Sequence, residues 1–151
     1  SPFNAFQTIQ GLETMPLRME RHCENGEKVA KYLAKHEKIS HAIHPSLQDG
    51  EMRRRADAYL SGGYGALVGF ELKGGKEAGM KFIDSLKMLY HVANIGDARS
   101  LAIHPASTTH SQLSPEEQVQ TGVTPGYVRL AIGIEHIEDI LADLEQALEA
   151  A

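Results

Sequence analysis

The sequence predicts an α+β sandwich in which helices cover a small, mostly antiparallel sheet. Three observations support this fold class: short strand-like segments recur along the chain, amphipathic segments separate them, and several connections have hairpin rather than crossover length. The chain has 151 residues, of which 42% are hydrophobic. This is enough for one domain with a real core but too little for two comfortable ones. We therefore expect a single domain over residues 1–151.

Amphipathic helices are predicted near both ends of the chain. The segment 14–36 begins with a threonine that can cap a helix, has a proline in its first turn and ends with basic residues. Gly26 is its weak point, since glycine lowers helix stability by about 1 kcal/mol relative to alanine. The predicted apolar stripe of this helix comprises Met19, Cys23, Val29, Ala30 and Leu33. The C-terminal helix has apolar residues at Ile137, Ile140, Leu141, Leu144 and Leu148.

Strands are predicted where apolar residues alternate or lie between glycine and proline. The strand-like segments are 38–45, 64–74, 90–97, 99–105 and 127–132. The last of them places Tyr127, Arg129 and Ala131 on one face and Val128, Leu130 and Ile132 on the other.

Three further segments connect the strands. We expect 46–60 to be an exposed helical or irregular connector whose arginine triplet faces solvent. The segment 76–89 has apolar residues, Met80 and Ile83 among them, at helical spacing and predicts a helix that packs on the preceding strand. Ser114 and Glu117 form a capping box that opens a short helix.

The charge and hydropathy of the chain argue against several partners. A net charge of −5 provides no basic surface for nucleic acid or anionic lipid. The longest apolar runs have only a few residues, far below the roughly 20 that a membrane helix needs. The single Cys23 cannot form an intramolecular disulfide, which fits a reducing compartment. We therefore expect a cytoplasmic protein with neither a nucleic-acid nor a membrane partner.

The segment SLAIHPASTTH, residues 100–110, concentrates two histidines and several hydroxyl groups. His104 and His110 are separated by six positions, and no cysteine or carboxylate lies at a spacing that would complete a metal site. No GxSxG motif supports a serine triad, and the glycine-rich stretches match no nucleotide-binding pattern. We therefore expect neither a metal site nor a catalytic residue here.

Two polar residues are candidates for binding a carboxylate. Arg129 lies within an otherwise apolar strand, where an unpaired guanidinium would be costly to bury, so something anionic should face it. That group is either the carboxylate of a ligand or one of the domain's own acids. Asn94 precedes a Gly-Asp turn, and its amide either donates to a carboxylate or stabilises the turn. The residues alone leave these alternatives open.

Nearly the whole chain resembles the C-terminal domain of the Cys/Met-metabolism pyridoxal-phosphate enzymes. The resemblance rests on GLETMPLRMERHCENG, HVANIGDARSLAIHPASTTHSQLSPEEQ and GVTPGYVRLAIGIEHIEDILADLEQAL. This family includes cystathionine γ-synthases, cystathionine lyases, methionine γ-lyases and O-acetylhomoserine sulfhydrylases. The chain is most similar to the sulfhydrylase branch, because lyases and γ-synthases typically have serine in place of Asn94 and commonly methionine in place of Thr108.

The resemblance implies a domain organisation and a set of site residues. Residues 1–151 would form the C-terminal small domain of a fold-type I transferase, with 1–36 as a helical lead-in from an N-terminal domain that binds the cofactor. Arg129 would bind the α-carboxylate of the substrate, and Asn94 would lie beside it. Ser100 and His104 would orient the loop at the active-site entrance rather than transfer protons.

The activity implied is that of a full-length homo-oligomer that makes homocysteine and acetate from O-acetylhomoserine and sulfide in methionine biosynthesis. Pyridoxal phosphate would serve as its electron sink. No lysine here stands in the family's Ser-x-x-Lys context, so we expect the chain alone to hold no cofactor and to be inactive. Two alternatives are the same domain of a cystathionine γ-synthase or methionine γ-lyase, and a non-enzymatic amino-acid-sensing or dimerisation module.

Overall fold

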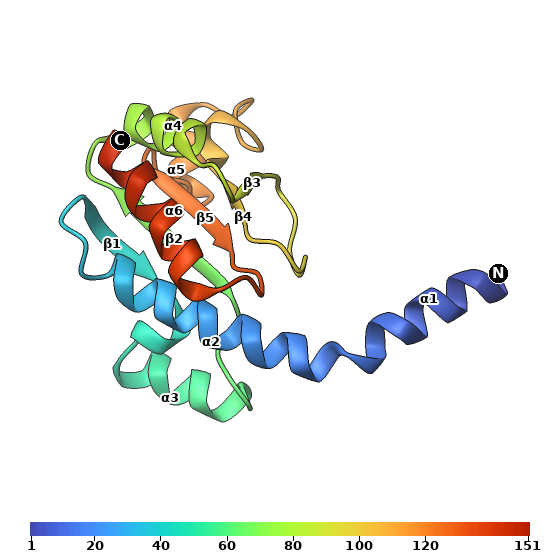
Figure 1. The fold of residues 1–151 in the computed structure, drawn as a ribbon. Helices are drawn as coiled ribbons and strands as arrows, with labels where there is room; N and C mark the ends of the chain where they lie inside the picture. Colours follow the sequence, from blue (N-terminus) through green and yellow to red (C-terminus); the bar gives the residue numbers. More distant parts are fainter.

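The computed structural model describes residues 1–151 as one sheet with helices packed on it, and α1 extends away from this body (Figure 1). The α-helices are α1 (Pro2–Glu13), α2 (Met15–Leu33), α3 (Gly50–Tyr59), α4 (Gly75–Ser85), α5 (Pro115–Gln120) and α6 (Ile137–Ala150). The strands are β1 (Ile39–Ile43), β2 (Leu67–Leu72), β3 (Tyr90–His91), β4 (Leu101–Ile103) and β5 (Tyr127–Ala131). Two short 3-10 helices, η1 (Pro45–Leu47) and η2 (Pro105–Ser107), follow β1 and β4.

The five strands form a single sheet in the order β1-β2-β5-β4-β3. The pairs β1–β2, β2–β5 and β4–β5 are antiparallel, and only the short β3–β4 pair is parallel. The predicted fold class, a mostly antiparallel sheet covered by helices, is therefore confirmed. β5 lies at the centre of the sheet, so its residues have a strand on each side.

The core lies between the sheet and the layer formed by α2, α4 and α6. Alternation along β5 directs Val128 and Leu130, both with no exposed surface, into this core, and the predicted division of β5 into two faces is confirmed. Phe70 of β2 meets Phe82 of α4 edge to face, with ring centroids 5.3 Å apart. Each large apolar side chain buried in this way contributes about 1.5–3 kcal/mol. The opposite sheet face carries the other β5 residues and is largely left open by these helices.

The buried face of α2 differs from the predicted stripe. Met19 is 46% exposed, while the buried residues of α2 include two polar side chains, His22 and Asn25. Gly26 is also buried, and a Cβ at this position would lie 2.8 Å from the Cα of Ala66. Gly26 is therefore a point of close backbone approach rather than a weak point. The hydrophobic pattern missed this because polar residues and glycine carry no apolar signal.

The remaining predictions for the connecting segments are confirmed, except that the helix predicted over 76–89 ends at Ser85 and that one of its apolar residues faces solvent. The connector around the arginine triplet is the helix α3, and α5 has its capping box, with Ser114 Oγ accepting from Glu117 N and Glu117 Oε2 accepting from Ser114 N. Met80, predicted to face the core, is 44% exposed. No helix of the structure combines the length and apolar character needed to cross a membrane.

Candidate functional site

Arg129 lies in the middle of β5 on the open face of the sheet. Its backbone is in register with Gly69 of β2 and Ile103 of β4. Because β5 is central, hydrogen bonds on both sides hold the Cα of Arg129 in place. A Cβ on Gly69 would lie 2.7 Å from the hydroxyl oxygen of Tyr127, so glycine leaves room for that ring beside the arginine. Burial raises the pKa of Tyr127, and the nearby Arg129 charge opposes this rise.

The guanidinium of Arg129 has no anionic partner in the structure. Its Nε is buried without a hydrogen-bond acceptor. Its Nη2 donates to the main-chain oxygen of Asn94 at 3.4 Å, and the ion pairs of the chain do not include this residue. A charged donor left with a single long hydrogen bond is costly, so the site is electrostatically prepared for an anion.

Asn94 lies beside Arg129, but its side chain serves its own turn. The side-chain amide Nδ2 of Asn94 donates to Asp97 Oδ2 at 2.5 Å. The main-chain oxygen of Asn94 accepts from Arg129. The turn-stabilising interaction considered for Asn94 is thus present in the structure. Asn94 and Asp97 lie in the exposed loop 92–99, so the Asn94 amide is accessible from solvent.

Ser100 and His104 are both completely buried and occupied by contacts within the fold. His104 Nε2 contacts Pro125 O at 2.8 Å, and since a carbonyl only accepts, Nε2 carries the proton. Nδ1 therefore accepts from Ser107 Oγ at 2.8 Å. Burial lowers the pKa of His104, partly offset by its bond to Pro125. This histidine is held as a neutral ring that joins β4 to the segment before β5.

A repeat of this arrangement was missed in the sequence. The tetrapeptide AIHP occurs at 42–45 and again at 102–105. In each copy a strand ends, a buried histidine occupies the N-cap position of a 3-10 helix, and its Nε2 meets a main-chain oxygen ahead of the next strand in the sheet. For His44 that oxygen belongs to Gly65, at 3.2 Å. The repeated tetrapeptide was the available signal for this shared structural role.

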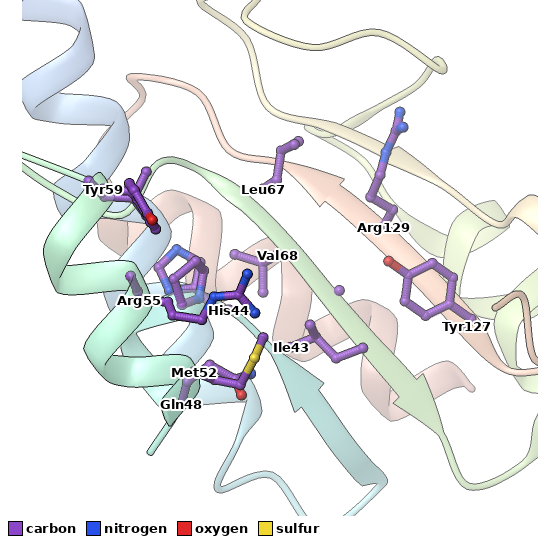
Figure 2. Close-up of a pocket in the computed structure, with 14 residues that line it drawn as sticks. Ile43, His44, Gln48, Met52, Arg55, Tyr59, Leu67, Val68, Tyr127 and Arg129 are labelled. Carbon is purple, nitrogen blue, oxygen red and sulfur yellow. The ribbon is translucent and has the colours of Figure 1, made fainter. Parts of the chain in front are cut away.

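An open groove of about 530 Å³ lies between α3 and the open sheet face. Figure 2 shows Arg55 extending from α3 toward Val68, and the Arg129 guanidinium directed away from α3. Within the arginine triplet, Arg53 pairs with Asp57 and Arg54 with Glu51, whereas Arg55 has no acidic partner. Arg55 is exposed, in keeping with the predicted solvated face, and it also lines the open groove.

No group of three or more histidine, cysteine or acidic side chains is arranged to bind a metal ion. The fold is thus a two-layer α/β domain, and the unpaired arginine on its open sheet face is suited to bind a carboxylate. The chain matches the model of the Cys/Met metabolism PLP-dependent enzymes over residues 1–149. It belongs to this family.

Individual relatives make the similarity more specific. The chain is 57% identical over 150 residues to an O-acetyl-L-homoserine sulfhydrylase of Leptospira meyeri, covering 99% of this chain and 34% of the relative. It is 44% identical to an L-methionine gamma-lyase of Fusobacterium nucleatum, covering 98% of this chain and 37% of the relative. The chain thus spans about a third of the length of these relatives.

A crystal structure from Campylobacter jejuni has the same fold, with a TM-score of 0.90 and 41% identity over 99% of this chain and 35% of the other. That protein is named as a candidate O-acetylhomoserine (thiol)-lyase and contains a pyridoxyl-lysine monophosphate.

Proposed function

We propose that this chain is the C-terminal, substrate-binding part of a pyridoxal-phosphate-dependent O-acetylhomoserine sulfhydrylase. The full-length enzyme would make homocysteine and acetate from O-acetylhomoserine and sulfide. The observation that carries the proposal is the half-buried Arg129, which has a buried Nε without an acceptor and no acidic partner. The 57% identity to the Leptospira sulfhydrylase supports the choice within the family.

In this proposal Arg129 binds the α-carboxylate of the amino-acid substrate. The planar guanidinium can hold a carboxylate through two parallel hydrogen bonds, which fixes orientation as well as position. Asn94 lies on the adjacent loop, where its amide could turn from Asp97 to a carboxylate oxygen. Holding the substrate in one orientation favours the reaction by reducing the entropy lost in reaching the transition state.

The residues present do not fit the cofactor itself. No lysine lines the groove beside Arg129. When bound, pyridoxal phosphate supplies an electron sink for negative charge that develops on the substrate. We assign its lysine and phosphate contacts to the preceding part of the full-length enzyme. Ser100 and His104 would support the loops beside the substrate through their contacts within the fold.

We further propose that residues 1–151 are the C-terminal domain and that 1–36 lead in from the cofactor-binding domain. α1 supports this division because an apolar residue recurs at every third position and stays exposed: Phe3, Phe6, Ile9 and Leu12. Such a stripe is typical of a helix face that another part of the molecule covers. We also predict that the full-length enzyme is cytoplasmic and forms a homo-oligomer.

Arg129→Ala in the full-length enzyme tests the proposal. Charge-assisted hydrogen bonds are worth about 1.5–3 kcal/mol, so KM for O-acetylhomoserine should rise by about 10-fold to 150-fold. Arg54→Ala is a matched control, because that arginine is exposed and pairs only with Glu51 on its own helix. An unchanged KM in Arg129→Ala would show that the arginine does not bind the substrate.

The second candidate is a methionine γ-lyase, favoured by the 44% identity to the Fusobacterium enzyme. The full-length enzyme should be assayed with O-acetylhomoserine plus sulfide, with O-acetylhomoserine plus cysteine, and with methionine alone. We expect homocysteine formation from the first mixture to be fastest. If cystathionine were the only product, or if methionine cleavage were fastest, the assignment based on Asn94 and Thr108 would be wrong.

A further inference from the structure

Glu135 forms a hydrogen-bonded clamp with Ser100 at the end of β5. Its Oε1 accepts from Ser100 N at 2.6 Å, and its Oε2 accepts from Ser100 Oγ at 2.9 Å. Ser100 Oγ in turn accepts from Gly133 N at 2.8 Å. We call Glu135, Ser100 and Gly133 the Glu135 clamp. Both carboxylate oxygens accept from Ser100, which lies 35 positions away in the chain. Glu135 therefore joins two distant segments directly.

The two segments joined by the clamp lie in close contact. A Cβ at Gly133 would be 2.4 Å from Ala98 O and 2.6 Å from Arg99 C. Ile134 N also donates to Ala98 O at 2.9 Å. Only glycine allows the backbone at 98–99 to cross this closely, and the Glu135 carboxylate then holds the crossing in place.

Side chains of α2 secure the opposite side of the same segment. His22 Nδ1 donates to Ile132 O at 2.6 Å. Asn25 Nδ2 donates to Gly133 O at 3.0 Å and to Glu135 O at 2.9 Å. Both side chains are buried. Hydrogen bonds from both sides therefore hold segment 132–135 rigidly to the core, so Glu135 presents its carboxylate from a fixed support.

The clamp lies at the base of the loop that faces Arg129. This loop, 92–99, is exposed along its length and ends at Ser100, where the Glu135 carboxylate holds it. Near its start, Asn94 O accepts from Arg129 Nη2. At its other base, β3 contributes only a two-residue pair with β4. The separation of Asn94 from Arg129 therefore depends strongly on the anchor at Ser100.

We propose that Glu135 is a positioning residue for substrate binding. It holds the base of loop 92–99, and through that loop it sets where the Asn94 main chain and amide stand relative to the Arg129 guanidinium. This inference rests on the proposed function, in which Arg129 and Asn94 receive the substrate carboxylate. Glu135 itself need not touch the substrate or the cofactor.

The test compares Glu135→Ala and Glu135→Gln in the full-length holoenzyme. A displacement of about 1 Å in a binding group can cost up to about 100-fold, so we expect Glu135→Ala to raise KM for O-acetylhomoserine by about tenfold. KM for sulfide should stay unchanged. Glu135→Gln keeps one oxygen to accept from Ser100 N but loses the second oxygen, which accepts from Ser100 Oγ. The KM of Glu135→Gln should therefore lie between those of the unchanged enzyme and Glu135→Ala. Hydrogen–deuterium exchange of 92–99 should accelerate in the same order.

Asp143→Asn is the matched control. Asp143 is another buried carboxylate that accepts main-chain N–H groups, those of Lys87, Met88 and Leu89 at 2.9, 2.9 and 3.0 Å, but it holds the segment before β3. We expect it to lower the unfolding midpoint without raising KM for O-acetylhomoserine or accelerating exchange in 92–99. If Asp143→Asn and Glu135→Ala raised KM equally, a general loss of stability would explain both and the inference would be overturned.

Arg129→Ala separates failure of this inference from failure of the proposed function. If Arg129→Ala raises KM and both Glu135 variants leave it unchanged, the positioning role is overturned while the substrate site stands. If Arg129→Ala leaves KM unchanged, the proposed substrate site is overturned, and the role of Glu135 in binding with it. A rise in KM in Arg129→Ala and Glu135→Ala, without one in Asp143→Asn, supports both.

Discussion

Gly26 lies where α2 comes closest to the segment that leads into β2, and Gly26→Ala places two opposing effects in direct competition. A Cβ at this position would be 2.8 Å from both Ala66 Cα and Gly65 O. These are backbone atoms, so neither can turn aside as a flexible side chain would. Gly65 O also accepts from His44 Nε2, so moving it would disturb a second buried contact.

The magnitudes decide the sign of this prediction. Alanine is favoured over glycine in a helix interior by about 1 kcal/mol. Overpacking a close-packed site costs about 1–3 kcal/mol, and contact with backbone places Gly26→Ala at the upper end. We therefore expect a net loss of about 1–2 kcal/mol. For a domain of this size such a loss lowers the midpoint of thermal unfolding by about 2–8 °C.

Thermal unfolding followed by circular dichroism measures this effect, and Gly11→Ala in α1 is its matched control. Gly11 is also helical, but a Cβ there would meet nothing within 4 Å. Gly11→Ala should therefore increase the helical signal without lowering the midpoint. If Gly26→Ala stabilised the protein as helix propensity alone predicts, the reasoning from close backbone approach would be refuted.

Two further predictions concern pH and helix capping. Burial lowers the pKa of His44 and of His104, so below about pH 6.5 the unfolded chain binds protons more readily than the folded one, and stability is lost as the pH falls. The urea midpoint of unfolding should therefore drop between about pH 7.5 and about pH 5.5. In a double variant with glutamine in place of His44 and His104, the midpoint should fall less steeply with pH. Equal slopes of the midpoint against pH in the two proteins would contradict this reasoning. Ser114→Ala should destabilise α5 by about 1 kcal/mol through loss of the cap, seen as faster hydrogen exchange in 115–120, whereas Glu117→Gln should cost less because the serine cap remains. Equal acceleration in both would show that the serine cap is not the main contribution.

The strands and helices could be predicted where one local pattern dominates. β5 is an example, because alternation alone separates the buried Val128 and Leu130 from Arg129 on the opposite face. The capping box of α5 is another, because Ser114 and Glu117 are three residues apart and interact within one turn. Met19 and Met80 were misplaced because helical spacing cannot say which apolar side chains another element will cover.

The candidate site was predicted only in part. Arg129 stood out because a charge interrupts an apolar strand, and Asn94 because it precedes a turn. Glu135 gave no such signal, since it is one of several acids around the start of the last helix. Its partner Ser100 lies 35 residues away in the chain, and the fold alone brings the two together.

The sequence by itself determined the class of fold, the face of β5 on which Arg129 lies and the resemblance to a family. These follow from periodicity, from caps within one turn and from long matching segments. Only the tertiary structure decided that Arg129 has no acidic partner and that the main-chain oxygen of Asn94 accepts from it. The tertiary structure also decided that Glu135 anchors the base of the loop that contains Asn94. The physical reason is that ion pairing, burial and close backbone approach depend on contacts between distant segments, and a linear pattern does not encode their distances.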